Sequence, residues 1–159
     1  MCRQRQIRIT IVVLVVGLLT ISVGWADRQA AQEGLEPFNP LVGKWRGIGL
    51  PRRGSNRGAW KQIGERIWDF ADDEVAVKYN VTDGNLVEHG RLTFDPEDGH
   101  YLLELVTPNQ LKRHYKGHLV KNKLTLESSP DSEGTIFRYS LTILNENRVL
   151  VLHEKQESN

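Results

Sequence analysis

The chain has 159 residues, with 21 Lys and Arg against 20 Asp and Glu, and one cysteine at position 2. Three of the basic residues lie within positions 1–26, so residues 27–159 carry 18 basic and 20 acidic side chains, a balance that implies no nucleic-acid partner. Without a further cysteine, this part has neither a disulfide framework nor a thiol nucleophile, and its stability must come from packing.

Residues 1–26 have the pattern of a secretory signal peptide. A basic start is followed by an apolar stretch from Ile11 to Trp25 and by small residues, Gly24 and Ala26, at the cleavage position. As a helix this stretch would span about 22 Å, less than the ~30 Å hydrocarbon core of a bilayer. We therefore expect an exported protein, periplasmic or secreted, with no stable membrane anchor after cleavage.

The rest of the chain divides into a polar segment and one domain. Residues 27–39 are polar and helix-permissive, and we expect a tether or one short turn of helix there. Pro37 and Pro40 mark the entry to the domain, residues 40–159.

Period-two alternation runs through this domain. It is clearest at residues 75–81, 92–94 and 137–143, where apolar and polar side chains alternate as in antiparallel strands with one wet face. Turn-forming residues break the chain about every 12 residues, and Asp83-Gly84 suits a two-residue hairpin. The pattern predicts an all-β, antiparallel up-and-down β-barrel of about 8–9 strands, with a β-sandwich as the alternative.

The segment Pro40-Leu41-Val42-Gly43-Lys44-Trp45 opens this strand series. In an exported protein of this size it resembles the lipocalin/calycin superfamily, especially its short bacterial lipocalin-like and nitrobindin-like members. The resemblance implies structural roles for two residues: Gly43 lets the chain bend into the first strand, and Trp45 plugs the closed end of the barrel. The chain departs from the transport lipocalins because it has no C-terminal helix, and Arg148 is a guess for the arginine that stacks on their tryptophan. Nitrobindin-like proteins also imply haem, with His153 as the ligand by its position.

Several polar side chains are expected to point into the apolar lumen. They are Arg66, Tyr79, Glu88, Arg113, Tyr115 and Tyr139. Arg66 shares a strand face with Trp68 and Phe70, and Ile63 and Ile67 lie on the opposite face. Arg66 therefore points inward only if the aromatic face is the inner one. An unpaired charge in a lumen is costly, so two readings stay open. Either Glu88 bridges an arginine in a self-satisfied network, or an arginine receives the acidic headgroup of a ligand.

Other patterns carry less chemistry. His114 and His118 would lie about 13 Å apart on a strand, too far for one metal ion. Asp95-Pro96-Glu97-Asp98-Gly99 lacks the distant glutamate of a calcium loop and fits a hairpin turn. A basic cluster surrounds a Gly-rich loop and consists of Arg46, Arg52, Arg53, Arg57 and Lys61. We expect this cluster to be either a solvated surface or a site for an anionic ligand or surface.

Taken together, these patterns predict a barrel that binds a small apolar or amphipathic ligand non-covalently, without a cofactor. The alternatives are a haem-binding barrel with His153 as axial ligand, a barrel enzyme of the isomerase or cyclase kind, and a filled barrel that serves protein contacts. No nucleophile, metal-hydrolase or acid–base motif argues for an enzyme.

Overall fold

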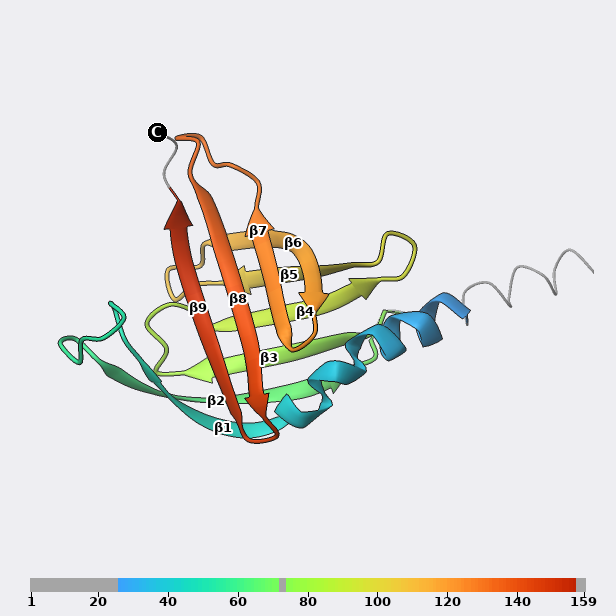
Figure 1. Ribbon diagram of the computed structural model, residues 1–159, viewed down its shortest axis with the longest axis horizontal. Helices are drawn as coiled ribbons and strands as arrows, with labels where there is room; N and C mark the ends of the chain where they lie inside the picture. Colours follow the sequence, from blue (N-terminus) through green and yellow to red (C-terminus); the bar gives the residue numbers. More distant parts are fainter. Residues whose placement is uncertain (1–25, 72–73, 157–159) are drawn as a thin grey trace, which may run out of the picture.

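The computed structural model describes residues 26–71 and 74–156 (Figure 1). Residues 26–35 are helical and lead into a 3₁₀ helix, η1 (Glu36–Leu41). Nine strands follow: β1 (Gly43–Gly49), β2 (Trp60–Asp69), β3 (Ala76–Thr82), β4 (His89–Asp95), β5 (His100–Val106), β6 (Lys112–Val120), β7 (Lys123–Ser128), β8 (Ile136–Asn145) and β9 (Arg148–Gln156). The expected signal peptide lies outside the described residues except for Ala26, so it stays a prediction.

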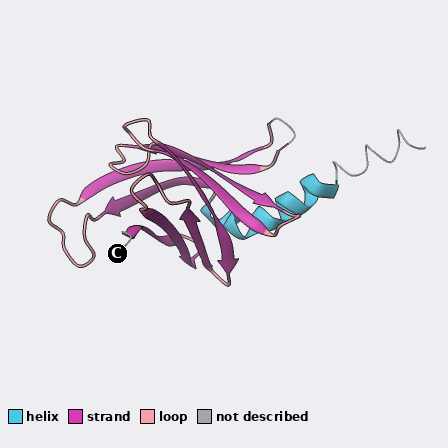
Figure 2. Cartoon of the chain, turned by 90° about the horizontal axis from the view of Figure 1, so that it is seen from above, coloured by secondary structure: helices cyan, strands magenta, loops and turns pink. Residues whose placement is uncertain are grey.

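The nine strands form one sheet in chain order, and every neighbouring pair is antiparallel. Figures 1 and 2 show that the sheet curls strongly, so that β7, β8 and β9 stand opposite β1, β2 and β3 across a concave face. The predicted all-β, up-and-down architecture is confirmed. Alternate side chains point to the concave face, as the pleat of a strand requires.

The curled sheet is a half-barrel, because its edge strands β1 and β9 do not pair with each other within the described residues. Strand direction alternates along an up-and-down sheet, so the first and the ninth strand run the same way. Direct closure would therefore need a parallel pair in an otherwise antiparallel sheet. The fold keeps the concave face of a barrel and leaves two edges open.

The N-terminal segment fills one end of this concave face. Leu35, Phe38 and Leu41 are buried in the main core, and Phe38 is only 2% exposed; we call this end the closed pole. The hydroxyl of Tyr101 donates to the Gly34 carbonyl at 2.6 Å and holds the segment in place. A Cβ on Gly34 would lie 2.2 Å from the ring of Phe94, which is why a residue without a side chain stands there. The segment expected to be a polar tether thus contributes to the core.

The β3–β4 connection differs from the expected two-residue hairpin at Asp83-Gly84. β3 ends at Thr82 and β4 begins at His89, so residues 83–88 form a longer loop. The Val81 amide donates to the Glu88 carbonyl at 2.7 Å, which pairs the ends of the loop. Within the loop Val87 is buried and Leu86 is exposed, so the alternation expected from β4 does not continue backward into it.

Candidate functional site

Five side chains from five strands meet in the middle of the concave face. The register pairs Trp45 of β1 with Gly64 of β2, and Arg66 with Tyr79 of β3. Tyr115 of β6 and Tyr139 of β8 face them, with their rings 6.3 Å apart. We call Trp45, Arg66, Tyr79, Tyr115 and Tyr139 the concave cluster.

The orientation of β2, which the sequence left open, is now clear. Arg66 is 6% exposed, whereas Ile63 and Ile67 are 53% and 41% exposed. Arg66 therefore points to the concave face together with Trp68, and the isoleucines lie on the outer, convex face. Trp68 packs against the main core, and neither isoleucine does.

The guanidinium of Arg66 has no anionic partner. Its Cζ lies 4.8 Å from the centre of the Trp45 ring and 5.6 Å from that of Tyr79. Within residues 26–71 and 74–156, it takes part in no ion pair and in no side-chain hydrogen bond. Cation–π contacts contribute about 0.5–2 kcal/mol each. Such contacts offset only part of the hydration that a charge loses when its side chain is largely buried.

The indole of Trp45 is a buried donor without a partner among the described residues. Its Nε1 is buried and has no hydrogen-bond partner. The indole packs across Gly64, where a Cβ would lie 2.4 Å from the ring. Trp45 is thus in the middle of the concave face, while Leu35, Phe38 and Leu41 occupy the closed pole that the family resemblance assigned to the tryptophan. Arg66, rather than Arg148, stacks on it.

The tyrosines of the cluster are neutral hydroxyl donors. Burial raises the pKa of Tyr79 well above its ordinary value, and the neighbouring Tyr139 raises it further. Burial also raises the pKa of Tyr139 and of Tyr115, although Arg66 and Arg113 respectively oppose this shift. A phenol that stays protonated can donate to an anion, so the cluster presents an arginine, an indole and three hydroxyls that are all able to donate hydrogen bonds.

Arg113 and His153 lie next to the cluster, toward the open end of the concave face. The Cζ of Arg113 is 3.9 Å from the Phe137 ring centre, and the ring of His153 meets that of Tyr139 edge-on at 5.1 Å. Loss of hydration beside the protein, and then the positive charge of Arg113, lower the pKa of His153 to about 4. This shift favours the neutral imidazole.

Glu88 does not join these residues. Its carboxylate accepts a hydrogen bond from the Gln110 amide at 2.6 Å, among exposed groups. It follows the irregular β3–β4 loop, which breaks the alternation that would have turned it inward. The structure therefore brings together Arg66, Tyr79, Tyr115 and Tyr139, with Arg113 beside them. Glu88, which the sequence suggested as a partner for an arginine, does not lie among them.

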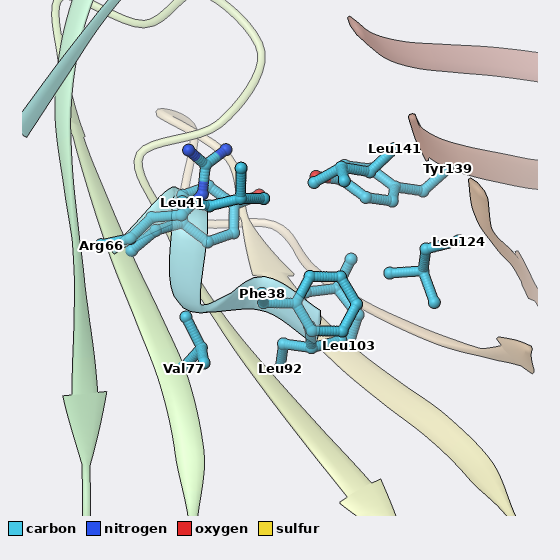
Figure 3. A pocket seen from close by; sticks show the side chains of 10 residues that line it. Phe38, Leu41, Arg66, Val77, Leu92, Leu103, Leu124, Tyr139 and Leu141 are labelled. Carbon is cyan, nitrogen blue, oxygen red and sulfur yellow. The ribbon is translucent and has the colours of Figure 1, made fainter. Parts of the chain in front are cut away.

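The enclosed space beside Arg66 is small (Figure 3). The cavity measures about 20 Å³, and its wall includes Phe38 and Leu41 from η1 together with Arg66, Tyr79 and Tyr139. One water molecule needs about 10–15 Å³, so the cavity has room for a single water molecule and is too small for haem. The side chains of Phe38 and Leu41 occupy the space that an empty barrel would offer to a ligand at this end.

Metal-binding side chains do not gather elsewhere. The part of the chain that the structure describes has no group of three or more His, Cys, Asp or Glu arranged around a common point. His114 and His118 have different neighbours, as their spacing predicts: His114 lies 3.7 Å from a Glu104 oxygen, and the His118 ring lies 4.1 Å from that of His100.

No protein-family model matches this chain, and no curated protein matches its sequence. The fold alone, a curled antiparallel half-barrel, agrees with a calycin-like architecture. In residues 26–71 and 74–156, none of the helical segments has the length and apolar character needed to span a bilayer.

Two features of the site were not expected from the sequence. The free Nε1 of Trp45 and the filling of the closed pole by Phe38 and Leu41 both depend on contacts between distant segments. A signal for the second existed, because Leu35, Phe38 and Leu41 recur at spacings of three, which fits one face of a helical segment.

Proposed function

We propose that the concave face binds a small amphipathic molecule that carries an acidic headgroup, in an exported lipocalin-like protein. The observation that carries the proposal is the largely buried side chain of Arg66, whose guanidinium has no counter-ion among the described residues. A carboxylate or a similar oxyanion would pair with this charge and could accept hydrogen bonds from the Trp45 indole and the tyrosine hydroxyls. Charge-assisted hydrogen bonds of this kind are about twice as strong as neutral ones.

The apolar part of the ligand would lie toward the open end. The closed pole is already packed with Leu35, Phe38 and Leu41. Beyond the cluster, Val81 and Phe137 point to the concave face and are only half-buried, so they offer apolar surface that a ligand can cover. Arg113, stacked on Phe137, would orient a second polar group or the same headgroup from the other side.

The test compares two ligands that differ only in their headgroup. Decanoate and decanol are titrated calorimetrically into the protein, into Arg66→Met and into Arg113→Ala. Loss of a charged hydrogen bond costs about 1.5–3 kcal/mol, so we expect Arg66→Met to weaken decanoate binding by about 10–100-fold and to leave decanol binding nearly unchanged. Arg148→Gln, an exposed arginine at the start of β9, is the matched control and should change neither.

Equal losses for the acid and the alcohol would contradict the headgroup role of Arg66. If neither decanoate nor decanol binds, the result would favour a second candidate, a filled half-barrel that contacts other proteins. The water-sized cavity is the observation that favours this candidate. The haem alternative is tested by adding haem to the purified protein: a Soret band that does not respond to His153→Ala removes it.

A further inference from the structure

The charged side chains in the connection between β1 and β2 are all positive. Residues 46–64 contain five basic side chains and no Asp or Glu. We call Arg46, Arg52, Arg53, Arg57 and Lys61 the basic hairpin. All five are exposed, and none forms an ion pair within the described residues. This is unusual in a domain whose cations and anions are almost balanced, and elsewhere on the sheet cations such as Lys78 and Arg138 do find carboxylates.

Large aliphatic side chains lie exposed among these cations. Ile48 is 73% exposed, and Ile63 and Leu50 are also exposed. The register places Ile48 opposite Lys61, and Ile63 opposite Arg46, on the convex face. Scattered exposed apolar residues are normal on protein surfaces, but here aliphatic and cationic side chains alternate on a single two-stranded unit.

The hairpin is also shaped to reach beyond the sheet. Gly54 and Gly58 adopt φ values of +80° and +77°, which only glycine adopts without strain, and they fold the chain into an extended loop. In Figures 1 and 2 this loop projects from the end of the sheet opposite to the helix at 26–35. Its side chains therefore can meet a flat partner before the rest of the domain does.

We propose that the basic hairpin docks on anionic lipid bilayers. Cations near an anionic membrane surface are attracted to it, and aliphatic side chains gain free energy when they enter the boundary between headgroups and acyl chains. A nucleic acid would satisfy the five charges equally well, but its phosphates offer nothing to Ile48, Leu50 and Ile63. Stacking on bases needs exposed aromatic side chains, and Trp60, the aromatic residue of this segment, is half-buried and packs across Gly49. The alternation of aliphatic and cationic groups is what selects the bilayer. This inference does not depend on Arg66 or on a ligand in the concave face.

Docking in this way would bring the open end of the concave face toward the membrane. The loop follows β1 at the end where Arg113 begins β6 and His153 lies near the end of β9, opposite to the closed pole. An amphipathic acid leaving a bilayer could then enter the concave face by a short path.

The experiment measures binding to vesicles by co-sedimentation. Vesicles of phosphatidylglycerol mixed with phosphatidylcholine are compared with vesicles of pure phosphatidylcholine. All protein variants begin at the same N-terminal residue, so that they differ only in the substitutions. Each cation near an anionic surface changes affinity by about fivefold, so we expect Arg52→Gln/Arg53→Gln to weaken binding to anionic vesicles by about 25-fold. The matched control is Lys121→Gln/Lys123→Gln, which removes two exposed charges at the β6–β7 turn, at the other end of the sheet, and should leave binding nearly unchanged. Ile48→Ser should weaken binding by a smaller factor.

Three results would overturn the proposal. Equal losses in the two double variants would mean that net charge acts, not the hairpin. Equal binding to pure phosphatidylcholine would remove the electrostatic part. If Ile48→Ser has no effect, and Arg52→Gln/Arg53→Gln weakens binding to a duplex oligonucleotide as much as to vesicles, the hairpin is a general polyanion site.

Discussion

Replacing Arg66 by methionine should make the protein more stable while it removes the headgroup site. The side chain of Arg66 is 6% exposed, and its guanidinium stands without a counter-ion among the described residues, so folding removes most of the water around this charge. Its contacts with the rings of Trp45 and Tyr79 offset part of this cost. Methionine has a similar length, can keep the packing against Trp45, and has no charge to desolvate.

The size of the effect can be bounded. A buried ion loses several kcal/mol of hydration even after relaxation, and two cation–π contacts return about 1–4 kcal/mol together. Replacement of buried ionic groups by apolar ones of similar volume commonly gains about 1–4 kcal/mol. We therefore expect Arg66→Met to raise the free energy of unfolding by about 1–3 kcal/mol.

Urea denaturation followed by tryptophan fluorescence and far-UV circular dichroism measures this change, with Arg148→Gln as the control for loss of one exposed arginine. A loss of more than about 1 kcal/mol in Arg66→Met would refute the reasoning. It would mean that the stack on Trp45 outweighs desolvation and that Arg66 is a structural residue, in which case the argument for an acidic ligand also loses its main support.

Two further predictions concern the closed pole and the tyrosines. Phe38→Ala should lower the free energy of unfolding by about 3–5 kcal/mol, as truncation of a buried phenylalanine does, and should enlarge the cavity beside Arg66. Urea denaturation measures the first effect, and binding of a small apolar probe measures the second. A change in the free energy of unfolding below about 1 kcal/mol would show that η1 is not part of the core. Because the folded state raises the pKa of Tyr79 and Tyr139, their contribution to stability is complete below the ordinary tyrosine pKa of 10 and is lost as pH rises above it. The free energy of unfolding should therefore fall in alkaline solution, and Tyr79→Phe should reduce that fall; an unchanged alkaline slope in Tyr79→Phe would contradict the assignment of the shift to burial.

The strands could be predicted from the sequence because their signal is local. Alternation at residues 75–81 and 137–143, with turn residues between such segments, reports which side chains share a face, and β3 and β8 lie where it indicates. The same rule placed Tyr79, Tyr115 and Tyr139 inward. Arg66 remained ambiguous because both faces of β2 carry large apolar side chains, and only the position of the core distinguishes them.

The errors arose where a distant segment decides the outcome. Glu88 follows strand alternation in the sequence, but the loop of residues 83–88 changes its orientation, and the loop is longer than its Asp-Gly signal suggests. The segment at 27–39 is polar overall, yet Leu35 and Phe38 pack against strands that follow much later in the chain. The spacing of Leu35, Phe38 and Leu41 indicates an apolar helical face, but it does not say which part of the sheet that face covers.

The two halves of the concave face also have different energetic roles. At the closed pole, burial of each large apolar side chain contributes about 1.5–3 kcal/mol, and Leu35, Phe38 and Leu41 add their share from outside the sheet. The middle of the face carries a charge without a counter-ion and an indole without an acceptor, both of which oppose folding. A marginally stable domain can keep such groups only if packing elsewhere compensates for them. The helical segment at the closed pole therefore does more than fill space: by stabilising one end of the concave face, it offsets the cost of the unpaired polar groups in the middle.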